Sequence, residues 1–413
     1  MSAGLKAERL FADLCNLQFL HGFVFHSPRF YDPTEKEAGD VVLWVRRQVV
    51  VVELLTREAE AGASTKQYVK RIGEKRRQLI EDYKVFTDPK VDVHLINEQG
   101  EEVYFDTRDL GVITVSGIIL LDCDAPLEKP HFKSIERILC LPFPGAVMTR
   151  QDFLDLTFEI DTIPDLTYYL ADRASFMREV YSQNPQSFLD LNRRLERNLI
   201  AFYKLNENSF PASQWQPAET FNYHQRYHRS LRERITVRDT ENLKSGLIDE
   251  LIDILRSHNK PEDSTLLHSW ELASLTRRQR AAISPKVADA IEKMRAGNPS
   301  RHFAFFNQAT GCWIVFYFQY GGERSAFAER TVRLTQQKLL VEVKQSDFIY
   351  SVFGYGFRKS LIHTGSTFDG IKLVVKDAAD HRIVSDDEYQ EALQYFERGK
   401  VRKLTEFPDG DPI

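Results

Sequence analysis

The sequence predicts an α/β protein built in three parts. Helical and strand-like patterns alternate over residues 5–150 and again over residues 300–400, while the pattern between them is mostly helical. We therefore expect an α/β domain at 1–150, a mainly helical region at 151–295 and a C-terminal α/β domain at 300–405. A length of 413 residues is typical of two or three domains.

The first domain predicts an αβββαβ core. Expected helices cover 6–20 and 64–83; expected strands cover 23–26, 41–45 and 48–55, with a loop at 27–36, and further strands at 91–97, 103–106, 112–121 and 145–148 extend the same sheet. Runs such as the four valines at 49–52 read as buried strand.

The other two regions show helix and strand patterns but weaker functional signals than the first. In the middle region we expect helices at 187–203 and 243–255, joined by a connector at 206–217. After a linker at 296–300, the C-terminal pattern predicts strands at 303–306, 313–320, 351–357 and 371–376 and helices at 324–340 and 386–398.

Composition narrows the functional class. Apolar residues make up 42 % of the chain and charged residues 28 %, as in globular proteins. A formal charge of −5 excludes a generally basic nucleic-acid binder but not a local basic groove. The four cysteines are far apart, which favours free thiols over a zinc site or disulfides. With no signal-peptide core and no apolar run of about 18 residues, we expect a cytoplasmic protein without a membrane segment.

Two carboxylates on neighbouring strands are the strongest chemical signal. If the two arginines after Val45 form a two-residue turn, Val45 pairs with Gln48 and Asp40 lies opposite Glu53 on the same face. A three-residue turn would put them on opposite faces. Facing carboxylates repel unless a divalent cation lies between them, and oxygen ligands suit Mg²⁺. Glu53 alone could equally mark the point where the valine strand reaches solvent.

Four short motifs share the order and spacing of a known superfamily. They are Ala7-Glu8-Arg9-Leu10-Phe11-Ala12, Gly22-Phe23-Val24, Gly39-Asp40-Val41-Val42 and Val51-Val52-Glu53-Leu54-Leu55-Thr56-Arg57. Together they resemble the restriction-endonuclease-like (PD-(D/E)XK) nucleases, with a layout most like the Holliday-junction-resolvase-like branch. The resemblance covers about 75 residues.

The resemblance implies a metal site that binds Mg²⁺ or Mn²⁺. Asp40 would be the central ligand, Glu53 the second and Glu8 the ligand from the first helix. Glu8 has an alternative role, since a carboxylate in the first helical turn is also favoured by the helix dipole. Leu55 stands where the superfamily has its catalytic lysine, which stabilises charge on the attacking water or the phosphate.

In some members the following helix supplies the missing basic group. Lys66, Gln67 and Lys70 are the candidates for this catalytic role here. Gln67 has a competing interpretation, because Ser64-Thr65-Lys66-Gln67 also fits a capping box. The alternatives stay open on the sequence.

Basic residues suggest where nucleic acid would bind. We expect phosphate contacts at Arg71, Lys75 and Arg76 on the second helix, and at Arg226 and Arg229 in the middle region. A solvated helix face is the simpler explanation of the first group. The expected partner is DNA; a protein partner through residues 150–413 and a homodimer remain open.

These signals lead to two functional hypotheses. The first is a metal-dependent DNA endonuclease, which the resemblance places in DNA repair, recombination or defence against foreign DNA. The alternative is a catalytically inactive pseudonuclease that binds DNA or serves as a scaffolding subunit, because Leu55 replaces the lysine.

Overall fold

A computed structural model gives the fold. The residues it describes are 9–15, 23–26, 29–32, 34–37, 39–56, 65–88, 93–96, 102–105, 114–122, 141–183, 195–206, 208–215, 223–227, 246–256, 264–297, 300–307, 309–345, 351–359, 368, 370–377 and 385–396. The chain divides into two compact units, residues 1–239 and 240–413, and each is described by itself. Across the described residues, no helix has the length and apolar character needed to cross a bilayer.

The first unit contains a mixed five-stranded sheet, with strand order β1-β4-β5-β8-β9. Its strands are β1 (Val24–His26), β4 (Val41–Val45), β5 (Gln48–Thr56), β8 (Thr114–Asp122) and β9 (Gly145–Thr149). The first three pair antiparallel, whereas β5, β8 and β9 run parallel. With the helix at residues 9–15 and with α2 (Thr65–Thr87) between β5 and β8, the elements follow the predicted αβββαβ order.

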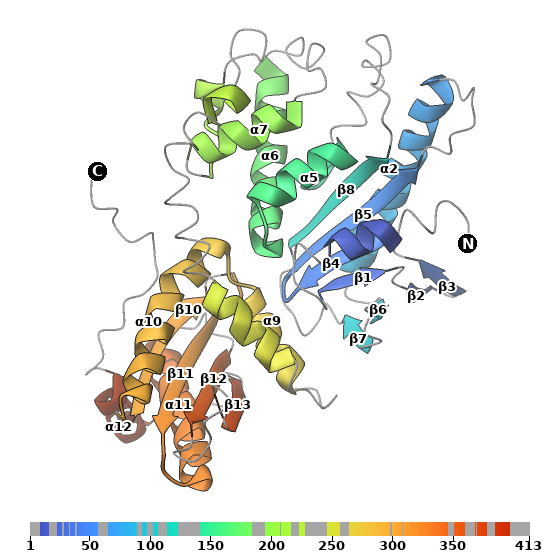
Figure 1. The fold of residues 1–413 in the computed structure, drawn as a ribbon. Coiled ribbons are helices and arrows are strands. Elements are labelled where there is room, and N and C mark those ends of the chain that lie inside the picture. The colour runs from blue at the N-terminus through green and yellow to red at the C-terminus, as the bar shows by residue number, and fades with distance from the viewer. Residues whose placement is uncertain are drawn as a thin grey trace. The chain divides into compact units, whose positions relative to one another are not determined.

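Helices cover both faces of this sheet (Figure 1). Helix α2 contacts β5 and β8 on one face, and α6 (Ile163–Gln183) contacts β4, β5, β8 and β9 on the other, where α5 (Arg150–Glu159) also packs. Because both faces are buried, β5 is apolar on both sides: all four valines at 49–52 are at most 1 % exposed. Strand β5 contains one charged residue, Glu53, and this residue is fully buried.

A second, smaller sheet corrects part of the prediction. Strands β2 (Arg29–Asp32), β3 (Thr34–Glu37), β6 (Val93–Ile96) and β7 (Glu102–Phe105) form a separate four-stranded sheet in the order β3-β2-β6-β7. The sequence predicted a loop over 27–36 and placed the 91–97 and 103–106 strands in the core sheet. Strand β3 has no apolar residue, so no hydrophobic alternation signals it.

The helical part of the first unit packs around aromatic side chains. Helix α7 (Leu195–Leu205) overlaps the predicted 187–203 helix and ends two residues beyond it, while residues 187–194 fall outside the described part. Phe202 on α7 and Phe176 on α6 belong to one buried cluster. Arg173 forms a buried ion pair with Glu196 at 2.8 Å, which joins α6 to α7. The predicted connector contains a short 3₁₀ helix, Ala212–Gln214.

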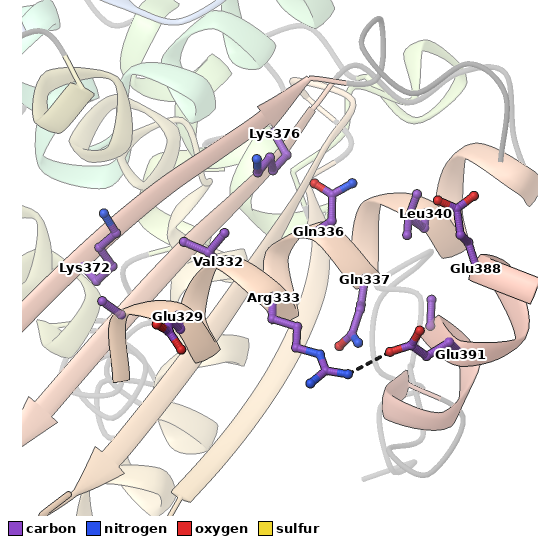
Figure 2. A pocket seen from close by; sticks show the side chains of 12 residues that line it. Glu329, Val332, Arg333, Gln336, Gln337, Leu340, Lys372, Lys376, Glu388 and Glu391 are labelled. Atoms are coloured by element: carbon purple, nitrogen blue, oxygen red, sulfur yellow. Dashed lines mark hydrogen bonds and ion pairs between the residues drawn. The ribbon is translucent and has the colours of Figure 1, made fainter. Parts of the chain in front are cut away.

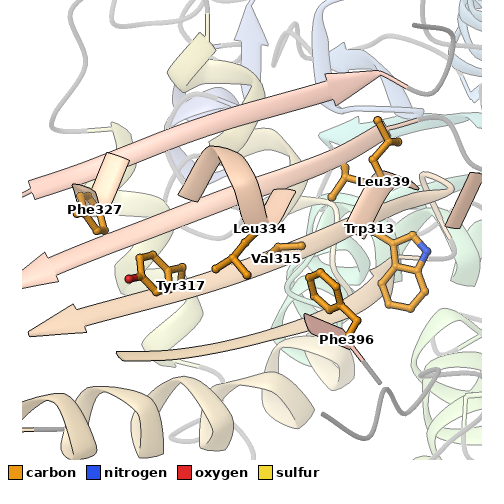
Figure 3. Packing of buried hydrophobic residues seen from close by; sticks show 8 residues of the cluster. Trp313, Val315, Tyr317, Phe327, Leu334, Leu339 and Phe396 are labelled. Carbon is orange, nitrogen blue, oxygen red and sulfur yellow. The ribbon is translucent and has the colours of Figure 1, made fainter. Parts of the chain in front are cut away.

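The second unit has its own four-stranded sheet, in the order β10-β11-β12-β13. The strands are β10 (Ser300–Asn307), β11 (Cys312–Tyr320), β12 (Ser351–Lys359) and β13 (Gly370–Asp377), and the central pair β11–β12 is parallel. Helix α11 (Arg324–Gln345) packs on one face and α12 (Asp386–Phe396) packs on α11. Figure 3 shows the resulting core, in which Trp313, Leu334 and Phe396 meet.

Two helices of the predicted middle region pack in this unit. Helices α9 (Ser264–Ala273) and α10 (Arg277–Arg295) contact β13 and the β10–β11 pair respectively. His268 of α9 contacts the rings of Phe353 and Tyr355, on the side of the sheet away from α11. The helical pattern of residues 151–295 is therefore shared between the two units. Residues 246–256 are also helical; they overlap the predicted 243–255 helix and end one residue beyond it.

Gly354 lets α11 lie unusually close to β12. A Cβ at this position would be 1.9 Å from Thr335 Oγ1 and 3.1 Å from its Cβ. We expect Gly354→Ala to lower the free energy of unfolding by about 1–3 kcal/mol, because the helix must move or Thr335 must change rotamer. Thermal unfolding measures this effect. The cost should shrink in a Thr335→Ala background; an equal cost in both backgrounds would contradict the proposed clash.

Candidate active site

The β4–β5 hairpin brings Asp40 and Glu53 together. Val45 pairs with Gln48, as a two-residue turn requires. The regular register ends at the Val41–Val52 pair, and the Asp40 amide also donates to Val52 O at 3.1 Å, so the pairing becomes irregular at Asp40. Asp40 and Glu53 are nevertheless close together, since both carboxylates contact the amine of Lys75. The directly opposed pair expected from the strand count is not part of the regular register.

Two local conformations make this geometry feasible. Arg46 has a positive φ of 50°, the left-handed conformation that a tight hairpin needs at its first central residue. Gly39 has φ 88°, and a Cβ there would meet Val51 Cγ1 at 2.7 Å. A glycine before Asp40 is thus required by both backbone angle and space. The Leu54 amide then donates to Asp40 Oδ2 at 2.6 Å and fixes the carboxylate.

Lys75 of α2 holds the two carboxylates. Its Nζ donates to Asp40 Oδ2 at 2.9 Å and to Glu53 Oε2 at 2.5 Å. The sequence assigned Lys75 to a phosphate track and not to the carboxylate pair. Its position follows from helical spacing, because Ile72 and Leu79 on the same face are buried against the sheet.

Asp82 is a site residue that the sequence analysis missed. It lies two turns after Lys75 on the same face of α2, is 4 % exposed, and its carboxyl group is close enough to Glu53 to raise the pKa of Glu53. A lysine and an aspartate seven residues apart, within the apolar stripe of a helix, are the signal that could have identified both.

Burial has the largest single effect on the pKa of each of Glu53, Asp82 and Lys75. Burial and the neighbouring Asp40 carboxylate raise the pKa of Glu53 to about 10. Burial also raises the pKa of Asp82 to about 6. For Lys75, burial lowers the pKa, but the charges of Glu53 and Asp40 more than offset this, so its pKa is raised and it remains an ammonium. One cation thus faces three acidic groups.

The carboxylates of Asp40 and Glu53 suit a hard divalent cation, but by themselves they do not form a complete set of ligands. Within the described residues, no three His, Cys, Asp or Glu side chains have the spacing of a full metal site. Mg²⁺ usually keeps several waters and binds one or two carboxylates together with substrate phosphate, so the Asp40–Glu53 pair suffices. Glu53 Oε1 has no hydrogen-bond partner among the described residues. Glu8, the third ligand implied by the resemblance, lies outside them.

Of the other predicted catalytic residues, the structure describes the side chain of Lys70, which does not join this cluster. Lys70 has a side chain 78 % exposed and pairs with Glu74 at 3.8 Å, so it is not the lysine at the carboxylates. Leu55 is buried at 2 % exposure. Lys66 and Gln67 lie in the first turn of α2, but their side chains fall outside the described part.

The described arginines that were predicted to contact nucleic acid lie in two segments of the chain, helix α2 and residues 223–227. Arg71 and Arg226 are exposed, and Arg76 is half-buried on α2. Arg229 lies outside the described residues. DNA contacts at these positions stay a prediction.

A separate groove of about 610 Å³ lies on the second unit, lined by α11, β13 and α12 (Figure 2). Lys372 and Lys376 extend from β13, while Arg333 and Glu391 form an exposed ion pair at 2.7 Å between the helices. The charges lining the groove are of both signs, and none of the predicted catalytic residues lines it.

The described residues define an α/β protein whose five-stranded sheet and helix α2 enclose a carboxylate–lysine site. Comparisons of the chain with protein-family models, with curated proteins and with solved structures found no match.

Proposed function

We propose that the chain is a metal-dependent DNA endonuclease of the restriction-endonuclease-like fold. The observation that carries this proposal is Lys75, whose amine contacts both Asp40 and Glu53. The site thereby has the aspartate, glutamate and lysine that the superfamily uses, although the strand position that normally carries the lysine is Leu55. The αβββαβ order and the antiparallel-then-parallel sheet support the same assignment.

The residues of this site suit phosphodiester hydrolysis. Asp40 and Glu53 would hold Mg²⁺ or Mn²⁺, which supplies Lewis-acid activation of water and phosphate when bound. Lys75 is placed to stabilise negative charge that develops on the phosphate during attack by water. The water oxygen forms the new bond to phosphorus, the P–O bond of the leaving strand end breaks, and the proton from water is transferred to that leaving oxygen. The Leu54 amide keeps Asp40 oriented throughout.

The biological setting is part of the proposal and rests on the resemblance and the sequence. It places the protein in the cytoplasm, acting on DNA in repair, recombination or defence. Residues 150–413 would then contact substrate or a partner protein, and a homodimer remains compatible with the site.

A pseudonuclease is the second candidate, and one observation favours it. The glutamate that would bind metal has its pKa raised to about 10, so it is protonated at neutral pH unless a cation is bound. In that case the fold would bind DNA or a partner without cutting.

Cleavage assays separate the two candidates. Purified full chain is incubated with plasmid, single-stranded and branched DNA in Mg²⁺, in Mn²⁺ and with a chelator. We expect cleavage that requires the metal and that Asp40→Ala and Glu53→Ala abolish. If none of the substrates is cut in either metal while DNA binding persists, the enzyme proposal is wrong and the pseudonuclease stands.

A further inference from the structure

Helix α2 carries one acidic side chain, Asp82, and one basic side chain, Lys75, that both lie next to Glu53. Asp82 lies on the sheet-facing side of α2 with 4 % of its surface exposed, and its carboxyl group contacts that of Glu53. Lys75, two turns earlier, contacts Glu53 Oε2 and Asp40 Oδ2. Glu53 is therefore the common neighbour of the other three ionisable side chains.

Two buried oxygens of this cluster are left without a hydrogen-bond donor. Within the described part of the chain, Glu53 Oε1 and Asp82 Oδ2 have no hydrogen-bond partner. Buried acidic oxygens are normally satisfied, and two arrangements would satisfy both of these: a proton shared between the two carboxyl groups, or a cation bound by both. Lys75 donates to Glu53 Oε2 and Asp40 Oδ2 and to neither of these two oxygens.

We propose that Asp82 is a further carboxylate of the metal site, which binds a hard divalent cation together with Glu53. The cation would use the oxygens that have no donor, so Lys75 can keep its contacts with Asp40 and Glu53 at the same time. Lysine and cation then act on one phosphate from neighbouring positions. This inference rests on the proposed nuclease function, because it concerns the cation of that same site.

Binding of Mn²⁺ to the full chain, measured by calorimetry without DNA, tests the role of Asp82. We expect Asp82→Asn to weaken Mn²⁺ binding by about 10- to 100-fold. Glu81→Gln is the matched control: it removes the same charge from the adjacent, exposed position of α2, and screening should limit its effect to less than about twofold.

Thermal unfolding without metal distinguishes a ligand from a structural residue. Asp82→Asn removes a buried charge and adds an amide that can donate to Glu53, so the metal-free variant should unfold at the same or a higher temperature than the wild type. Weaker metal binding by a protein of undiminished stability cannot come from misfolding. If Asp82→Asn does not fold, Asp82→Ser serves as the second neutral variant.

The outcomes separate this inference from the function on which it rests. Wild-type affinity in Asp82→Asn would overturn the role of Asp82 but leave the Asp40–Glu53 nuclease intact. Absence of Mn²⁺ binding by the wild type would overturn both the role of Asp82 and the metal-dependent function.

Discussion

Replacing Lys75 by methionine is expected to slow metal-dependent DNA cleavage by about 100- to 1,000-fold. Methionine has a similar length but no charge, so the stabilisation of developing phosphate charge is lost while most of the packing on α2 is kept. The measurement is the single-turnover cleavage rate at saturating Mg²⁺. The loss should persist at higher Mg²⁺ concentration, since removal of a neighbouring cation does not weaken binding of another cation.

Lys70→Met is the matched control for Lys75→Met. Lys70 lies on the same helix but its side chain is exposed and paired with Glu74, away from the carboxylates. Cleavage by this variant should stay close to the wild-type rate. A larger loss in Lys70→Met than in Lys75→Met would show that the lysine predicted from the sequence, and not the one seen at the carboxylates, acts in the reaction.

Glu53→Gln is expected to change activity and stability in opposite directions. Cleavage should fall at least as strongly as in Lys75→Met, because a metal-binding carboxylate is lost. The metal-free protein should instead gain about 1–2 kcal/mol in free energy of unfolding, or about 2–6 °C in Tm. The physical reason is that the wild type must take up a proton at neutral pH to bury Glu53, a cost that glutamine does not have. The introduced amide can also donate to Asp82 and still accept from Lys75.

The gain in stability should depend on pH. Folding raises the pKa of Glu53 from its ordinary value of 4.5 to about 10, so its protonated form is favoured in the folded state. Its contribution is therefore most favourable below pH 4.5 and declines as the pH rises toward 10. The Tm difference between Glu53→Gln and the wild type should widen between pH 5 and pH 8, whereas Glu81→Gln should show little change. A constant or shrinking difference would contradict the raised pKa.

The sequence could predict the carboxylate pair because its geometry is local. Asp40 and Glu53 flank one hairpin, so a count along two strands is enough to expect them close together, although the regular register ends at Val41, one residue after Asp40. The strands around them could be predicted from hydrophobic runs, which are typical of strands buried on both sides. Only the two-residue turn had to be inferred, since Arg46 is an unusual residue for a positive φ.

The helix residues could not be placed in the same way. Which residue of α2 reaches Glu53 depends on how the helix packs across β5 and β8, and that is a long-range property. The sequence therefore pointed to Lys66, Gln67 and Lys70 near the start of the helix, whereas Lys75 reaches the acids from further along. The β2–β3 hairpin escaped prediction for another reason: it pairs through its backbone and has almost no apolar pattern.

The placement of the lysine on α2 also affects when the protein can become active. If the lysine lay on the strand itself, the lysine and the two carboxylates would come together as soon as the hairpin formed. Here the hairpin holds only the acids, and both Lys75 and Asp82 arrive with a helix that is synthesised later and must dock on the sheet. A nascent or partly folded chain therefore has an incomplete centre, and under the proposed nuclease function the ability to cut DNA would depend on completed assembly of this domain.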